Sequence, residues 1–394
     1  MDTKQKKRLS IQNLIREEKK CSRSEIAALL RIDKKSVSTV IDELLAEKMI
    51  ISAGFRESQA GRRQELLSLF GGHSNYIGID LGATHIIGVR TDLNCRVLDR
   101  VVFEIRPGLS VDLIMEQMKS IISTLMNSDS ATAELQAVGV CLPGFVNPVE
   151  GISLTAENIP GWHEIKIRNI LEEKIGKPVY VEDCSRAMGL AERWLGKGGE
   201  AQNFLVLDLG YGIGMAIFTE GRLYTGSGYK SGEIGHTVVN KDGPLCTCGK
   251  KGCLEVYASG RGIARIASDR VSQKKSQILD ELIRGDAKSV TAQDVALAAS
   301  MNDELSLQII SEAGEYIGTA LSHGVNVLNP EKIIVGGGLT GAGKPLFDSI
   351  QKALEAHVMK EIMADVAIEQ SELGIDISAM GSALVAMGHV FKPN

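Results

Sequence analysis

Three cysteines and one histidine gather in the stretch GEIGHTVVNKDGPLCTCGKKGCLE. His236 is followed by Cys246, Cys248 and Cys253, which gives the spacing His-x9-Cys-x-Cys-x4-Cys. Three thiolates and one imidazole complete a closed tetrahedral set, and such a set suits a structural zinc ion better than a catalytic one, which needs an open position. The spacing therefore predicts a structural zinc site. The alternative is a loop that merely holds three reduced cysteines.

A second stretch that could do chemistry is VEDCSRAM, from Val181 to Met188. It follows the β-prone GKPVYV and leads into a helical pattern. A loop at the carboxyl end of a strand is where α/β proteins usually place their chemistry. Here that loop offers the carboxylate of Asp183 beside the thiol of Cys184, so we expect these two residues to lie at a functional site.

Three glycine-containing turns follow predicted strands. They are Asp80-Leu81-Gly82, Asp208-Leu209-Gly210 and Gly336-Gly337-Gly338. Each alone is more often a plain turn, but their order and spacing resemble the phosphate and adenosine cradle of actin-like sugar kinases, where backbone N–H groups face the nucleotide.

The elements that must position these residues are those of an α/β fold. After residue 70, short β-rich runs alternate with longer helical stretches. The stretches YIGIDLGATHIIGVRTD and FLVLDLGYGIGMAIFTEGRLY follow the same plan of strand, turn and strand. We therefore expect residues 71–394 to form an actin-like α/β body of two related lobes, which carries the zinc loop.

Residues 1–70 have a different pattern, typical of three short helices and a hairpin. We expect Ser24 to cap the second helix, and the third to cover KKSVSTVIDELLAEKM. The expected inward residues are Leu9, Ile11, Leu14 and Ile15, then Ile26, Ala27, Leu29 and Leu30, and finally Val37, Val40, Ile41, Leu44 and Leu45. The following IISAGFRESQAGRRQELLSLF predicts two strands around a basic tip.

This arrangement indicates a winged helix-turn-helix that binds DNA. Basic and hydroxyl residues cluster on the third helix and at the tip, where Lys and Arg would neutralise phosphates and Ser or Thr would reach base edges. The alternative is a helical docking module with a solvated charged face. The expected DNA-binding residues are Lys34, Lys35, Ser36, Ser38, Thr39, Arg62 and Arg63.

Charge separates the same two parts of the 394-residue chain. Residues 1–70 hold 15 Lys and Arg against 10 Asp and Glu, whereas the remainder holds 29 against 39. The net charges of +5 and −10 favour a polyanionic partner for the first part.

Seven cysteines argue against a disulfide framework, and no apolar run approaches the ~20 residues of a membrane span. The polar start MDTKQKKRLS lacks a signal peptide, so we expect a soluble cytoplasmic protein that does not enter membranes.

Taken together, these motifs resemble the ROK family (repressor, open reading frame, kinase), and specifically its transcription-factor branch, similar to the xylose and N-acetylglucosamine repressors. The motifs that carry the resemblance span essentially the whole chain; besides the winged helix-turn-helix they are DLGAT, LTAENIPGW, EIGH, CTCGKKGCLE and VGGGLTGAG. The resemblance implies an actin-like sugar-binding fold, zinc at the cysteine cluster, and a homodimer or homotetramer. It also implies control of operator binding by a mono- or oligosaccharide.

The resemblance also implies sugar contacts at particular residues. Histidine 236 would give one ring nitrogen to zinc and the other to a sugar hydroxyl. The implied sugar-binding set, with Asp183 from the loop described above, is Asn158, Asp183, Glu233, His236 and Glu255.

At VEDCSRAM the chain departs from the family's kinases. At this loop the kinases have a sequence similar to Glu-Asn-Asp-Ala-Asn, and its Asp is the base that deprotonates the sugar hydroxyl. This chain has Cys184 at that position, and a thiol with a pKa of about 8.5 is mostly protonated at neutral pH. The phosphate turns also differ, and we expect the larger side chains to crowd the space that phosphates need. The altered positions are Ala83, Tyr211, Met215 and Ala216.

The leading interpretation is therefore a sugar-responsive transcriptional repressor that has lost kinase activity and is not an enzyme. One alternative is a bifunctional protein, an ATP-dependent sugar kinase that also binds DNA. A third is a zinc-containing scaffold that binds neither DNA nor sugar. Residue 184 and the phosphate turns favour the first interpretation over the second.

Overall fold

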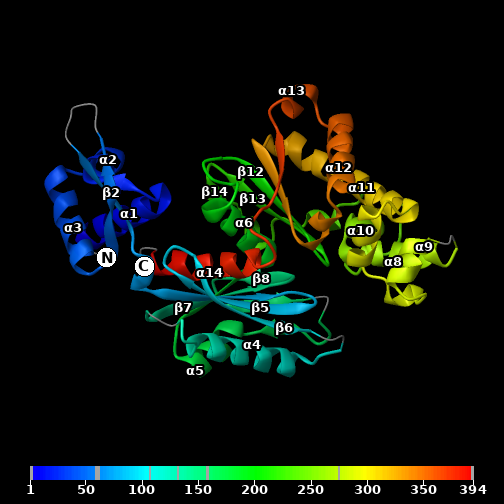
Figure 1. The fold of residues 1–394 in the computed structure, drawn as a ribbon, viewed down its shortest axis with the longest axis horizontal. Coiled ribbons are helices and arrows are strands. Elements are labelled where there is room, and N and C mark those ends of the chain that lie inside the picture. Colours follow the sequence, from blue (N-terminus) through cyan, green and yellow to red (C-terminus); the bar gives the residue numbers. More distant parts are fainter. Residues whose placement is uncertain are drawn as a thin grey trace. The chain divides into compact units, whose positions relative to one another are not determined.

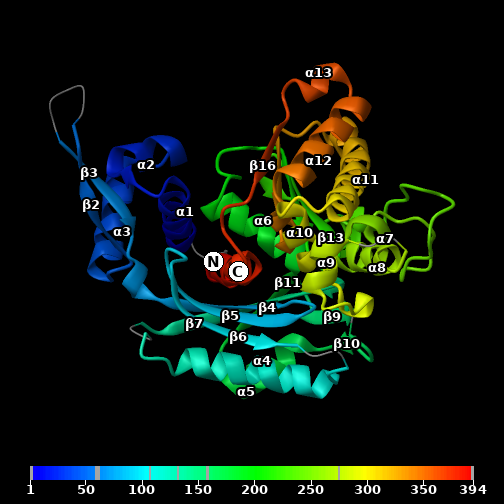
Figure 2. The ribbon, with the colours of Figure 1, turned by 45° about the vertical axis from the view of Figure 1, so that its right-hand side comes forward.

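The computed structural model describes residues 3–57, 63–105, 108–130, 133–156, 159–273 and 276–391. The chain divides into two compact units, whose elements are drawn in Figures 1 and 2. Unit 1 comprises Met1–Cys184 and Ala379–Asn394, and unit 2 comprises Ser185–Ser378. The chain thus passes from one unit to the other after residue 184 and returns after residue 378.

The described part of residues 1–70 forms three helices, a β-hairpin and a short additional strand. The hairpin strands and the short strand make a small antiparallel sheet of order β1-β3-β2. The elements are α1 (Thr3–Glu18), β1 (Cys21–Ser22), α2 (Arg23–Leu30), α3 (Lys34–Ala46), β2 (Ile50–Arg56) and β3 (Gln64–Leu69). The prediction of three helices followed by two strands is confirmed, although β1 was not expected.

Two predictions about α2 are wrong. The helix is capped by Ser22 instead of Ser24, because Ser22 Oγ accepts the Glu25 N–H at 3.3 Å while Glu25 Oε2 accepts the Ser22 N–H at 2.8 Å. This reciprocal pair is a capping box. Leu29 does not point into the core, since 58% of it is exposed. The two-turn helix fully buries only Ile26 and Ala27.

Unit 1 also contains a five-stranded sheet of order β11-β7-β4-β5-β6. The first three strands in sequence form an antiparallel meander, and β7 and β11 extend it in parallel. Its strands are β4 (Asn75–Leu81), β5 (His85–Asp92), β6 (Val97–Glu104), β7 (Leu135–Leu142) and β11 (Val179–Asp183). A separate small sheet contains β8 (Phe145–Asn147), β9 (Ile152–Thr155) and β10 (His163–Ile165).

Helices cover both faces of the five-stranded sheet (Figure 1). Helices α4 (Val111–Met126) and α5 (Ile167–Ile175) share an apolar core with one face. The other face carries α14 (Ile377–Val390), which belongs to unit 1 from Ala379 onward.

The approach of α14 to the sheet is unusually close and depends on two glycines. Gly78 of β4 and Gly139 of β7 are direct partners in the sheet. A Cβ at Gly78 would lie 1.9 Å from the Ala379 carbonyl oxygen, and one at Gly139 would lie 1.7 Å from that of Ser382. Any side chain at either position would therefore push α14 away from the sheet.

The far end of α14 contacts the first helix of the chain. Arg16 of α1 lies over the Phe391 ring, with Cζ 5.5 Å from its centroid, and Asn13 Nδ2 donates to the Phe391 carbonyl at 3.3 Å. On the sheet side, His389 stacks on Tyr180 of β11 at 4.2 Å between ring centroids. Within unit 1, α14 therefore connects the sheet to the amino-terminal helices.

Unit 2 repeats the sheet of unit 1. Its order is β14-β13-β12-β15-β16, again an antiparallel meander extended by two parallel strands. The strands are β12 (Phe204–Leu209), β13 (Ile213–Thr219), β14 (Arg222–Leu223), β15 (Lys332–Gly336) and β16 (Ala367–Gln370). The predicted pair of related α/β halves is confirmed, and Asp80 and Asp208 occupy equivalent ends of β4 and β12.

Most helices of the described residues belong to unit 2. They are α6 (Cys184–Leu195), α7 (Glu255–Ala258), α8 (Gly260–Val271), α9 (Gln277–Leu282), α10 (Ala292–Ser300), α11 (Glu304–Leu328), α12 (Lys344–His357) and α13 (Lys360–Met363). All of these except α6 contribute to one large apolar core with the sheet of unit 2. Among the described residues, we found no helix that is both long enough and apolar enough to span a membrane.

The glycine pair under α14 generates a stability prediction. Gly139→Ala is expected to lower the free energy of unfolding by ~1–3 kcal/mol or more, because overpacking forces the helix to move. Gly388→Ala is the matched control, since a Cβ at that position in α14 would meet no atom within 4 Å. The control is expected to be neutral or stabilising by ~0.5–1 kcal/mol. Urea denaturation of both variants measures the difference, and equal midpoints would contradict the described packing.

Candidate functional site

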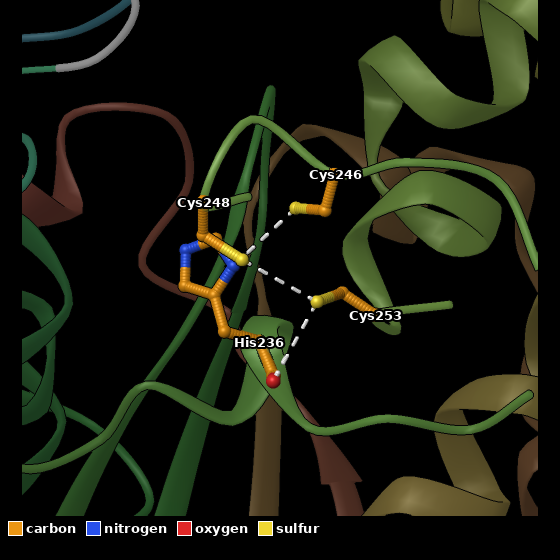
Figure 3. Close-up of side chains that lie close together, drawn as sticks. All are labelled: His236, Cys246, Cys248 and Cys253. Carbon is orange, nitrogen blue, oxygen red and sulfur yellow. Dashed lines mark hydrogen bonds between the residues drawn. The ribbon is translucent and has the colours of Figure 1, made fainter. Parts of the chain in front are cut away.

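The predicted metal ligands come together in unit 2, as Figure 3 shows. His236 ends the short 3₁₀ turn Ile234–His236, and the three cysteines follow in the loop before α7. An isolated antiparallel bridge between Val238 and Cys253 closes this loop on itself, and the Leu254 N–H donates to the Thr237 carbonyl at 2.8 Å. The backbone therefore holds the histidine next to the last cysteine.

The donor atoms have the spacing that a tetrahedral ion requires. All four ligand atoms lie within 4.8 Å of one another. Cys248 Sγ is 3.6 Å from Cys253 Sγ, and Cys246 Sγ is 3.6 Å from His236 Nδ1. With Zn–S bonds of about 2.3 Å and Zn–N bonds of about 2.0 Å, the edges of a zinc tetrahedron are about 3.8 and 3.5 Å. The cluster can therefore hold a metal ion without rearrangement.

The cluster is largely enclosed by protein. Cys253 is completely buried and Cys246 is 3% exposed. Burial, and then the neighbouring sulfurs of Cys248 and Cys246, raise the pKa of the Cys253 thiol to about 12. A metal ion that binds here displaces thiol protons, because thiolates are the ligands.

Two carboxylates from the predicted sugar-binding set flank this cluster in sequence. Glu233 immediately precedes the turn that ends in His236, and Glu255 begins α7 two residues after Cys253. Glu255 is only 9% exposed, and its Oε1 pairs with Arg261 Nη2 at 2.7 Å. The pair also involves the cysteine loop, because Arg261 Nη2 lies 3.3 Å from Thr247 Oγ1.

Arg261 is a residue that the sequence analysis missed. It is the second residue of α8, and its guanidinium carbon lies 5.7 Å from the centroid of the Tyr211 ring. The Gly260 N–H, next to it, donates to the Gly210 carbonyl at 2.9 Å. The start of α8 thus fixes the turn after β12, and an Arg six residues after a Glu was the available signal.

The prediction that Met215 and Ala216 crowd a phosphate site is wrong. Met215 is 7% exposed and belongs to the core of unit 2, and Ala216 is completely buried. A Cβ added to Gly189 of α6 would lie 2.4 Å from the Ala216 Cβ, so Ala216 packs against that helix. In contrast, Tyr211 is 46% exposed at the turn itself. Ala83 is half-buried in the corresponding turn of unit 1.

The other predicted site lies in unit 1, where Cys184 meets Asp80. Cys184 Sγ donates to Asp80 Oδ1 at 3.4 Å, and Cys141 Sγ donates to the same oxygen at 3.3 Å. The contact with Cys141, and then burial, hold the pKa of the Cys184 thiol well above its ordinary value. Burial likewise raises the pKa of Cys141 to about 12. Cys184 is therefore a thiol at neutral pH and a poor proton acceptor.

The remaining members of the predicted sugar-binding set are Asp183 and Asn158. Asp183 is the last residue of β11 and is half-buried, and its N–H donates to Glu182 Oε1 at 2.9 Å. Asn158 lies outside the described residues.

The predicted DNA-binding residues are located mainly on α3. Lys34, Lys35 and Thr39 are exposed there, whereas Ser36 and Ser38 are half-buried. Asp33 caps the helix, with Oδ1 accepting the Ser36 N–H at 2.8 Å. Arg63 is exposed just before β3, and Arg62 lies outside the described residues.

Comparison with known proteins adds independent information. The model of the ROK family matches residues 76–389. The xylose repressor of Caldicellulosiruptor bescii is 27% identical, and the match covers 94% of this chain and 92% of that protein. The glucokinase of Halalkalibacterium halodurans is 34% identical, with 78% of this chain and 93% of that protein covered.

A crystal structure of a ROK family transcriptional regulator, described as a homologue of the Escherichia coli MLC protein, has a similar fold. Its TM-score is 0.83 at 24% sequence identity, and the match covers 98% of this chain and 96% of that one. The fold of the described units is therefore shared over nearly the whole length of both chains.

The cysteine cluster predicts that the purified protein binds a divalent metal ion here. Cys253→Ser and Cys248→Ser are expected to lower the metal content and the melting temperature, because a site that forms only on folding stabilises the folded state. Cys21→Ala is the control, since Cys21 is buried in β1 of unit 1. Elemental analysis and thermal denaturation measure both effects. A metal content that is unchanged in both cluster variants would contradict the assignment.

Proposed function

The chain belongs to the ROK family, and we propose that it is a DNA-binding transcriptional repressor controlled by a sugar. The observation that carries this proposal is the extent of the similarity. The match to the xylose repressor covers 94% of the chain, whereas the match to the glucokinase covers 78% and the family model begins at residue 76. Because the match to the repressor covers 94% of the chain, most of the first 70 residues fall within it.

We propose that residues 1–70 are a winged helix-turn-helix domain and that α3 is its recognition helix. Two observations support this role. Helices α2 and α3 are joined by a short turn in which Arg31 adopts a left-handed conformation, with φ at 52°. The hairpin β2–β3 follows α3, and exposed lysines lie at the start of α3, where a recognition helix contacts base edges and phosphates.

We propose that the metal is zinc and that it supports a sugar site. Three sulfur donors and one imidazole nitrogen are the ligand set of structural zinc sites. Because His236 faces the cysteines with Nδ1, its Nε2 is the nitrogen available for a sugar hydroxyl. Glu233, Glu255, Asp183 and Asn158 complete the proposed set, and carboxylates and imidazoles make the directional hydrogen bonds that polyols require. A dimer or tetramer on a symmetric operator is the expected assembly.

We propose that the protein does not phosphorylate its sugar. By the resemblance to the family, the half-buried thiol of Cys184 takes the position at which the kinases have a carboxylate base, and its raised pKa favours the protonated thiol. Phosphoryl transfer depends on positioning and charge stabilisation, and Tyr211 alters one of the phosphate turns. The 34% identity to a glucokinase favours a second candidate, a bifunctional kinase and regulator.

The proposed DNA-binding role predicts salt-dependent binding to the protein's own upstream region. Lys35→Ala and Arg63→Ala are each expected to weaken binding to all sequences. Each is also expected to reduce the slope of log affinity against log salt by about 0.9 for each DNA-bound subunit, or about 1.8 for a dimer, because every subunit loses one phosphate contact. Thr39→Ala is expected to change the preference among sequences instead. Fluorescence anisotropy over a range of salt concentrations measures these effects.

Lys360→Ala serves as the control for charge alone, because Lys360 is an exposed lysine of α13 in unit 2. It is expected to leave DNA affinity unchanged. If the wild-type protein bound its upstream region no better than random DNA, with and without every sugar of a mono- and oligosaccharide panel, the repressor proposal would fail.

The proposed loss of kinase activity has a separate test. The sugar that raises the melting temperature most is incubated with labelled ATP, magnesium and either wild-type protein or Cys184→Asp. Neither protein is expected to form sugar phosphate. Loss of a general base lowers the rate of the reaction by a factor of ~10² to 10⁴. Restoring the base with Cys184→Asp does not restore the altered phosphate turn. Stoichiometric sugar phosphate from the wild type would support the bifunctional alternative.

A further inference from the structure

Unit 1 contains a second group of metal-ligating side chains, separate from the His236 cluster. Asp80, Cys141 and Cys184 each offer one ligand atom, and these atoms lie within 4.8 Å of one another. Asp80 is in β4, Cys141 is its direct partner in β7, and Cys184 follows the last residue of β11. Three neighbouring parallel strands therefore bring the three ligands to one edge of the sheet.

The distances in this group match those of a tetrahedral site. Asp80 Oδ1 is 3.3 Å from Cys141 Sγ and 3.4 Å from Cys184 Sγ. With metal–sulfur bonds of about 2.3 Å and metal–oxygen bonds of about 2.0 Å, a tetrahedral ion needs sulfur–oxygen edges of about 3.5 Å. The donor–donor distances of the His236 cluster also match the edges of a metal tetrahedron, so both groups have the spacing that a tetrahedral ion requires.

The type of ion follows from the ligands. Two sulfur donors exclude magnesium and calcium, which prefer oxygen, and favour thiophilic ions such as Zn²⁺ or Cd²⁺. We propose that Asp80, Cys141 and Cys184 form a second metal site, which binds a thiophilic divalent cation through two thiolates and one carboxylate oxygen. Three protein ligands leave the fourth tetrahedral position for water or another small ligand.

Binding of the divalent cation releases two thiol protons. The S–H bonds of Cys141 and Cys184 break, two metal–sulfur bonds form, and both protons pass to solvent. The carboxylate of Asp80, which accepts both thiol hydrogen bonds in the absence of the ion, becomes the oxygen ligand. Because Cys184 is the last residue of the first segment of unit 1, the bound ion would attach the end of that segment to β4 and β7.

Cadmium is the probe, because cadmium thiolates absorb in the ultraviolet and the ion replaces zinc in cysteine sites. Full-length wild-type protein is expected to bind two ions per chain, one in each cluster. The variants Cys141→Ser and Cys184→Ser are each expected to bind one cadmium ion per chain tightly. The control Cys21→Ala changes a buried cysteine elsewhere in unit 1 and is expected to bind two cadmium ions per chain. Elemental analysis after gel filtration gives the stoichiometry, and circular dichroism confirms that each variant is folded.

A reciprocal variant isolates the proposed site. Cys246→Ser with Cys248→Ser leaves unit 1 unchanged, so this protein is expected to retain one cadmium ion and part of the thiolate absorbance. Adding Asp80→Asn to it is expected to weaken that binding by about 10-fold or more, because an anionic ligand becomes neutral. One ion per chain in the wild type, or two in Cys141→Ser and Cys184→Ser, would overturn the proposal.

Discussion

The register of β4 against β7 is the constraint on which the rest of unit 1 depends. It pairs Gly78 with Gly139, which opens the surface on which α14 lies. Two residues further along, the same register pairs Asp80 with Cys141. Because side chains alternate along a strand, a shift of one residue would move both pairs together. Helix packing and the Asp80 cluster are therefore set by one alignment of two strands.

The position of α14 joins distant parts of the chain within unit 1. Its first residues in this unit contact the central strands, and the chain just beyond it, at Phe391, contacts α1. The helix also begins where the chain returns from unit 2. An effector that displaced α14 would therefore act on the packing of the amino-terminal helices, which is the physical connection that a sugar-controlled repressor requires.

Unit 2 has its own sheet of the same topology, and the turn after its first strand lies next to the His236 cluster. Its turn after β12 is fixed by the first residues of α8, and Arg261 joins that helix to Glu255 of α7 and to Thr247 of the cysteine loop. Tyr211, Arg261 and Glu255 therefore form one connected group next to the metal cluster. Loss of a bound metal ion would release the loop that carries Thr247 and leads into Glu255 of α7, so the proposed sugar contacts would depend on the ion.

The sequence by itself determined the features whose parts are close in the chain. The four residues of the His236 cluster fall within one short stretch, and the bridge between Val238 and Cys253 closes that stretch on itself. The alternation of strands and helices, the repeated Asp-Leu-Gly turns and the three amino-terminal helices are also local patterns, and the structure confirms these elements. The Ser22 cap was missed because two serines were available and only backbone conformation selects between them.

Only the tertiary structure decided which distant residues meet. Cys141 is 61 residues from Asp80 and Cys184 is 104 residues from it, so their contact depends on parallel pairing that no local pattern encodes. The burial of Met215 and Ala216, instead of their exposure at a phosphate turn, likewise depends on the place of β13 within the sheet, where Met215 joins the core of unit 2 and Ala216 packs against α6. Spacing along the chain identifies the His236 cluster, but strand register decides that Asp80, Cys141 and Cys184 meet at the ends of three strands.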